Sequence, residues 1–123
     1  MMPEQQTASQ TPALTLEQRS AFYVLGYLFL RMGQFERSKR VFSALAALNP
    51  KDHWAQRNLA AIAMHAGDGA AALRHLQQAL HEGPLSTSDA ALHLIRAKAL
   101  WLEGRKDEAR GAVNEFIHLT GGE

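Results

Sequence analysis

Cysteine is absent from this chain of 123 residues, and neither sign of charge is in strong excess. Without cysteine the chain cannot form a disulfide framework or use a thiolate nucleophile, and it is compatible with a reducing compartment. Thirteen basic and 12 acidic side chains leave a formal net charge of +1. This balance argues against nucleic acid or an anionic membrane as the main partner.

Long apolar runs are also missing. The most apolar stretch, AFYVLGYLFLRMG at 21–33, is bracketed closely by Arg19 and Arg31 and is shorter than the roughly 20 residues that a membrane-spanning helix needs. Residues 1–13 have neither a basic start nor an apolar core, so we expect a flexible tail there and no secretory signal. We therefore expect a cytoplasmic protein without a membrane span.

The residue patterns of enzymes and metal sites are likewise lacking. The chain has six histidines, but no two of them are three or four positions apart, so no helix offers a ready pair of metal ligands. Gly67-Asp68-Gly69 follows a predicted helix and lacks the lysine of a phosphate-binding loop. We predict no catalytic residue, no metal and no cofactor, and hence no enzyme.

What the chain does have is a helical pattern from Leu14 onward. Alanine and leucine dominate, and no segment alternates with the period of two that is typical of strands. Glycine and proline mark the stops between helices. We predict an all-α fold, with one domain over 14–120 and helices at about 15–32, 35–48, 52–66, 69–81, 88–103 and 106–119. Thr15 with Gln18 predicts a capping box, and Asp52, Asp68 and Asp89 are predicted to cap later helices.

These stops recur at a fixed interval. Gly33 and Gly67 are 34 residues apart, and so are Pro50 and Pro84. Phe42 and Leu76 keep the same interval, and Val113 follows Leu76 by 37 because the intervening loop is longer. A repeat of this length predicts stacked helical hairpins, at about 19–52, 53–86 and 90–123.

The pattern resembles the tetratricopeptide repeat, a helix–turn–helix unit of 34 residues. Its positions read Phe22, Leu25, Gly26, Phe29, Ser38, Phe42, Leu45 and Pro50 in the first hairpin, and Gln56, Leu59, Ala60, Ala63, Ala72, Leu76, Ala79 and Pro84 in the second. The third departs from the pattern at His93, Arg96 and Gly121. The resemblance implies three hairpins in a short right-handed solenoid, with Gly26 and Ala60 small where paired helices cross.

A narrower resemblance is carried by VLGYL at 24–28 and LNP at 48–50. These segments are similar to those of the YscY family, three-repeat chaperones of bacterial type III secretion. Membership would imply binding of a small export partner of the YscX type, and contact with the cytosolic domain of the export gate. The alternative is a general tetratricopeptide scaffold of a larger bacterial assembly.

The apolar stretch at 21–33 has two apolar faces. Phe22, Leu25, Gly26 and Phe29 are expected to face the partner helix of the hairpin. The family geometry implies a groove lined by the first helix of each hairpin, through Tyr23, Tyr27 and Leu30, then Trp54, Arg57, Ala61 and Met64, then Leu94, Lys98 and Trp101. An amphipathic helix of another protein would suit such a groove. The alternative for the aromatic residues is a place in the core between hairpins.

The last predicted helix is also unusually apolar, through Val113, Phe116, Ile117 and Leu119. Solenoids normally end in a helix with a polar outer face. Three alternatives stay open: the helix packs on a partner, it packs on a second copy, or its apolar residues pack backward. A homodimer through the groove or through this helix is therefore an alternative when the partner is absent.

Overall fold

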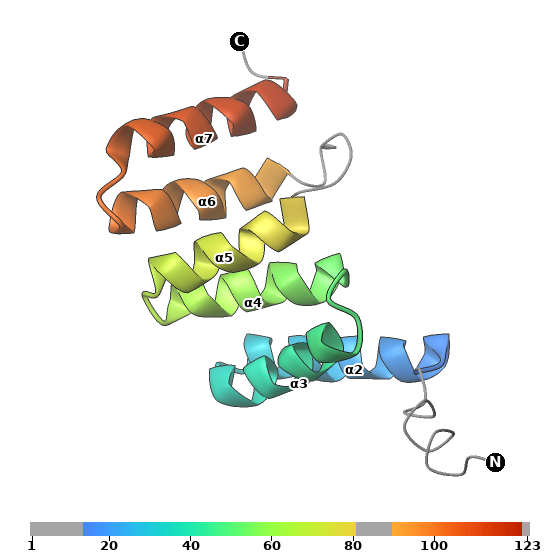
Figure 1. The fold of residues 1–123 in the computed structure, drawn as a ribbon. Coiled ribbons are helices and arrows are strands. Elements are labelled where there is room, and N and C mark those ends of the chain that lie inside the picture. The colour runs from blue at the N-terminus through green and yellow to red at the C-terminus, as the bar shows by residue number, and fades with distance from the viewer. Residues whose placement is uncertain (1–13, 81–89, 122–123) are drawn as a thin grey trace, which may run out of the picture.

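The computed structural model describes residues 14–80 and 90–121, and these form helices joined by turns (Figure 1). In chain order the helices are α2 (Leu16–Arg31), α3 (Phe35–Leu48), α4 (His53–His65), α5 (Gly69–Leu80), α6 (Ala90–Leu102) and α7 (Lys106–Leu119). The predicted all-α fold is confirmed. The predicted tail at 1–13 and the predicted cap Asp89 lie outside the described residues.

Side-chain caps begin the helices where the sequence predicts them. The backbone N–H of Gln18 donates to Thr15 Oγ1, and the backbone N–H of Thr15 donates to Gln18 Oε1, both at 3.0 Å. Asp52 Oδ1 accepts from the backbone N–H of Ala55 at 3.1 Å. Each such cap satisfies a backbone donor that the first turn leaves unpaired, and it stabilises the helix by about 1 kcal/mol.

Glycine ends the first helix of a hairpin. Gly33 after α2 and Gly67 after α4 have φ angles of 76° and 74°, in the left-handed region that other residues rarely adopt. The chain reverses there, and the second helix of the hairpin begins within three residues. The predicted stop signals therefore act as the turns of the hairpins.

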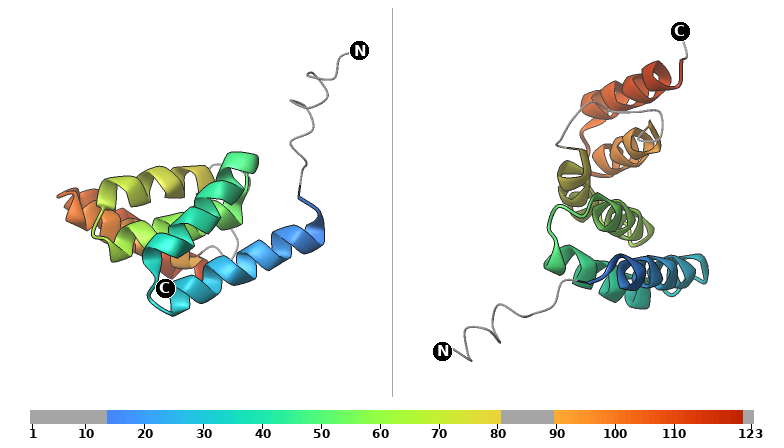
Figure 2. Two further views of the ribbon diagram at one scale, coloured as in Figure 1. Left: turned by 90° about the horizontal axis from the view of Figure 1, so that it is seen from below. Right: turned by 90° about the vertical axis from the view of Figure 1, so that its right-hand side faces the viewer.

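Three hairpins, α2–α3, α4–α5 and α6–α7, stack in chain order, so that the described start and end of the chain lie at opposite ends of the stack (Figure 1). The right-hand view of Figure 2 shows α2, α4 and α6 along one side, with α3 and α5 along the other. This is the arrangement that the repeat predicts. None of the described helices combines the length and the apolar character that a membrane crossing requires.

Within the first hairpin the two helices lie in close contact at Gly26. A Cβ atom at this position would lie 2.8 Å from ring atoms of Phe42, which is 1% exposed. The hydroxyl of Ser38 donates to the backbone oxygen of Gly26 at 2.8 Å. The prediction that Gly26 is small because α2 and α3 cross there is confirmed.

Apolar clusters join neighbouring hairpins. Phe42 and Leu45 of α3 pack with Leu59 and Ile62 of α4, and Leu76 of α5 packs with Leu92 of α6. Fully burying one such side chain stabilises the fold by about 1.5–3 kcal/mol. Each cluster thus holds one hairpin to the next.

The first helix differs from its counterparts, because Gly26 is its only buried residue in the described chain. Phe22 and Leu25, which were expected to face the partner helix, remain 39% and 41% exposed. The corresponding residues of α4 are buried: Leu59 is 4% exposed and packs with Phe42 and Leu45 of the preceding hairpin, and Gln56 is 8% exposed and contacts His75 of its partner helix α5. That Phe22 and Leu25 face the partner helix stays a prediction; their exposure shows that one partner helix does not bury them, and α2 has no preceding hairpin within the described residues.

Candidate protein-interaction surface

We define the groove face as the surface formed by the ten sequence-predicted residues of α2, α4 and α6. One member, Tyr23, is held by a hydrogen bond to the second hairpin. Its hydroxyl donates to Asp52 Oδ2 at 2.5 Å, while the other oxygen of the same carboxylate caps α4. Burial, followed by the hydrogen bond to Asp52, raises the pKa of Tyr23 to about 12. Tyr23 is therefore a neutral, oriented donor at neutral pH.

Around this pair lies a hollow of about 580 Å³ between the first two hairpins. It is lined by Tyr23, Trp54 and Arg57, which the sequence predicts, and by Arg19, Asn49, Lys51, Asp52 and His53, which it does not. Arg19, Lys51 and Arg57 set three cations against the single carboxylate of Asp52. The hollow therefore favours an acidic group of a ligand.

Sequence reasoning missed Arg19 and Lys51, although a signal was present. Arg19 precedes Tyr23 by four positions, and residues four apart share one face of a helix. Lys51 stands next to Asp52, the residue that caps α4. Both could have been placed from the predicted helix starts.

Exposed aromatic rings on the groove face each lie near a cation. Trp54 is 64% exposed, with the guanidinium carbon of Arg57 at 5.3 Å from its ring centre. Tyr27 is half exposed, and Arg31 lies 6.0 Å from its ring centre. Contacts of this kind stabilise by about 0.5–1 kcal/mol at exposed sites. They also hold the rings at the surface, where a partner can cover them.

The same pairing recurs at the third hairpin. Trp101 is 54% exposed, and Lys106 Nζ lies 4.9 Å from its ring centre. Trp101 and Lys98 line a hollow of about 440 Å³ between α6 and α7. Leu94, on the same helix, is 43% exposed. The predicted residues of α6 are thus all accessible.

Five predicted groove residues are partly buried: Tyr23, Leu30, Arg57, Ala61 and Met64. Leu30 packs against the cluster that joins the first two hairpins, and Met64 packs against the cluster of Ala63, Ala72 and Ala99. These two side chains therefore divide their surface between the core and the groove face. Tyr27, Trp54 and Trp101 carry most of its accessible aromatic area.

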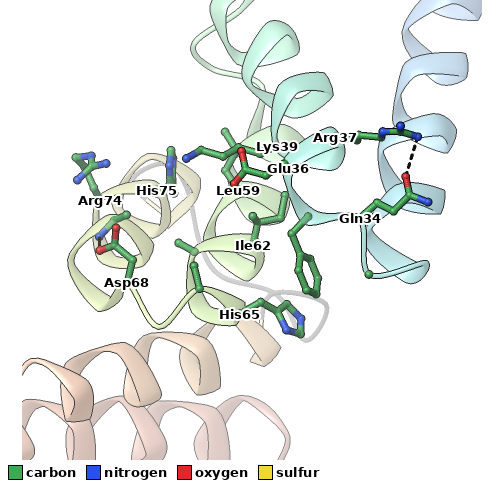
Figure 3. A pocket seen from close by; sticks show the side chains of 15 residues that line it. Gln34, Glu36, Arg37, Lys39, Leu59, Ile62, His65, Asp68, Arg74 and His75 are labelled. Carbon is green, nitrogen blue, oxygen red and sulfur yellow. Dashed lines mark hydrogen bonds between the residues drawn. The ribbon is translucent and has the colours of Figure 1, made fainter.

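A larger hollow, of about 750 Å³, lies between α3 and α5 with α4 as its floor (Figure 3). Leu59 and Ile62 form part of that floor, and Lys39, Arg74 and His75 gather along one rim. The ring of Phe35 stacks on His65 at 4.6 Å. Sequence reasoning did not predict this hollow, because it arises where two hairpins meet and no single helix pattern encodes it.

His75, one of the residues on that rim, forms a polar contact with α4. Its Nδ1 lies 2.8 Å from Oε1 of Gln56, a residue of α4 that is 8% exposed. Burial, together with the nearby charges of Arg74 and Lys39, lowers the pKa of His75 below its ordinary value. The neutral imidazole is therefore favoured in the folded protein.

The part of the chain at 14–80 and 90–121 contains no group of three histidine or acidic side chains arranged to hold a metal ion. The exposed aromatic rings and their cations are the features of the groove face that can bind a ligand. The groove face is built from the first helix of each repeated hairpin, so the family of the repeat indicates what kind of ligand such a surface binds.

The tetratricopeptide repeat model matches residues 23–87 and again 66–122. The chain belongs to the tetratricopeptide-repeat family. The second match includes α6 and α7, so the third hairpin is a tetratricopeptide unit despite its departures at His93 and Arg96. Stacked tetratricopeptide units present extended surfaces that bind other proteins. A comparison with curated protein sequences gave no significant match.

Proposed function

We propose that the groove face binds an amphipathic helix of another protein. The observation that carries this proposal is the row of exposed aromatic rings, Tyr27, Trp54 and Trp101, each accompanied by a cation. Tyrosine and tryptophan provide large contact area with little loss of side-chain entropy, and they dominate binding energy in protein interfaces. Apolar residues of the partner helix would cover the rings, and its acidic residues would meet the cations.

The hollow beside Tyr23 would set the orientation of the partner helix along the groove face. Arg19, Lys51 and Arg57 concentrate positive charge in this hollow at the α2–α4 end of the groove face, whereas the α6 end combines the apolar surface of Trp101 and Leu94 with the cations Lys98 and Lys106. A partner helix with an apolar face, and with acidic residues that are most frequent at the end that meets this hollow, complements both ends. The narrower proposal is that this partner is a small YscX-like export protein of type III secretion, and that the chain is its cytoplasmic, non-enzymatic chaperone. The cytosolic domain of the export gate is a second expected contact.

The narrower proposal is supported by the resemblance of VLGYL at 24–28 and LNP at 48–50 to the YscY family. The alternative is a general scaffold that binds a helix of a different assembly through the same face. Both use the same rings and differ only in the partner.

Co-expression of the tagged chain with a YscX-type candidate tests the proposal. We expect the candidate to copurify with the chain and to be lost when Trp54 is replaced by Asp. If the candidate does not bind but another amphipathic helix binds in a Trp54-dependent way, the scaffold alternative holds. If no helical partner binds through Trp54, the proposal for the groove face is wrong.

A further inference from the structure

The two ends of the hairpin stack carry apolar surfaces that the groove face does not include. The start face consists of Leu25 and Leu28 on α2, which are 41% and 50% exposed. The end face consists of Val113, Phe116 and Ile117 on α7, of which Val113 and Ile117 are 38% and 39% exposed. α2 and α7 lie at opposite ends of the stack (Figure 1).

The start face is one half of an interface that the chain already forms internally. Leu59 and Ile62 of α4 follow Leu25 and Leu28 by 34 residues, the interval of the repeat. They are only 4% and 5% exposed, because they pack in one cluster with Phe42 and Leu45 of the preceding hairpin. The start face therefore has the side chains that a preceding hairpin covers elsewhere in the chain.

The end face is the other half of the same interface. Val113 follows Leu76 by 37 residues, and Leu76 follows Phe42 by 34. Phe42 and Leu76 are each 1% exposed and pack in clusters with residues of the next hairpin, Leu59 and Leu92. The residue of the second hairpin that corresponds to Ile117 is Leu80, which packs against the cluster that contains Leu92. The end face therefore has the side chains that a following hairpin covers.

We propose that copies of this chain associate head to tail, with the end face of one copy packed on the start face of the next. A second copy is the occupant that fits, because this contact would repeat the interface that Phe42 and Leu45 of the first hairpin form with Leu59 and Ile62 of the second. Such a contact is heterologous, so it leaves a free face at each end and assembly continues unless a ring closes. This association goes beyond the function proposed for the groove face and uses different residues.

Sedimentation of the full chain over a wide concentration range tests this inference, with three variants. Leu28→Asp places a charge on the start face, and Ile117→Asp places one on the end face. Val24→Asp is the matched control, because Val24 is 58% exposed on α2. Its repeat equivalent, Asn58, is polar, and its side-chain amide donates to the backbone oxygen of Trp54 within the same helix. Circular dichroism checks that each variant is folded, and Leu28→Lys replaces Leu28→Asp if the latter unfolds.

We expect the average mass of the unmodified chain and of Val24→Asp to rise with concentration above the 13.6 kDa of one copy. Leu28→Asp and Ile117→Asp should each remain at one copy. An equal mixture of the two should form a discrete pair, because each variant retains the face that the other has lost.

Several results would overturn the inference. The unmodified chain could remain a single copy at high concentration, or the mixture could fail to form a pair. Self-association of Ile117→Asp alone would instead indicate a symmetric contact of α2 with α2. Self-association of Leu28→Asp alone would place the contact away from the start face.

Discussion

Tyr23 and Asp52, 29 positions apart, are joined by a hydrogen bond that links the first hairpin to the helix start of the second. One oxygen of Asp52 accepts from the Tyr23 hydroxyl, and the other accepts from the backbone N–H of Ala55. The carboxylate thus fixes both the position of α2 against α4 and the first turn of α4. Because Tyr23 also lines the hollow of the groove face, fold and binding surface share this contact.

Removing the Tyr23 hydroxyl tests this link. Tyr23→Phe should lower the free energy of unfolding by about 1–2 kcal/mol, since a hydrogen bond to a charged acceptor is lost. Asp52→Ala should cost about 2–3 kcal/mol, because the helix cap is lost as well. The double variant should lose little more than Asp52→Ala alone. Urea unfolding measures all three, Tyr27→Phe is the control, and additive losses would contradict the link.

Gly26 and Gly111 form a natural pair for testing the crossing of α2 and α3. At Gly26 an added Cβ meets the Phe42 ring, whereas at Gly111 of α7 nothing lies within 4 Å. Gly111→Ala should stabilise the fold by up to about 1 kcal/mol through helix propensity alone. Gly26→Ala should instead destabilise it by about 1–2 kcal/mol through overpacking. Thermal unfolding compares them, and equal stabilisation by both would refute the tight crossing.

Negative charges placed on the groove face should strongly weaken partner binding. Trp54→Asp and Tyr27→Asp each replace an exposed ring, so we expect loss of at least about 2 kcal/mol, or roughly 30-fold weaker binding. Both positions are half exposed or more, so the variants should remain folded. Calorimetry with the copurified partner measures the change. Val24→Asp is again the control, and unchanged binding in both variants would remove these rings from the interface.

The stability of the protein should depend on pH through His75. Its pKa is below 6.5 in the folded protein, mainly because of burial, so the unfolded chain binds this proton more readily. Its contribution to stability is complete above pH 6.5 and is lost as the pH falls from 6.5 through the folded pKa. His75→Gln should therefore lose less stability on acidification than the unmodified chain. Urea midpoints above and below pH 6.5 measure this difference, and parallel pH profiles would contradict it.

The architecture could be predicted from the sequence because its signals are local. Glycine after a helix and aspartate before one each act within about one turn, and the interval of 34 residues can be read along the chain itself. Leu25 shows that burial cannot be predicted from the local sequence alone. Its helix pattern equals that of Leu59, yet the first is 41% exposed and the second 4%, because burial depends on the neighbouring hairpin.

The candidate site shows the same limit. The rings of Tyr27, Trp54 and Trp101 could be placed from helix periodicity and the family geometry, and all three are exposed. The contributions of Arg19 and Lys51 to the first hollow depend on how two hairpins meet. So does the hollow between α3 and α5, which joins residues that are distant in sequence.

The sparse burial of α2 has a consequence for how the protein opens. Each neighbouring hairpin adds to the burial of the next, so the stack loses order first at an end, where only one described neighbour packs. With Gly26 as its only buried residue, α2 is the helix most easily released, and its amide protons should exchange with solvent faster than those of α4. A ligand that covers Tyr27 would slow that exchange. Ligand binding would therefore rigidify the whole first hairpin.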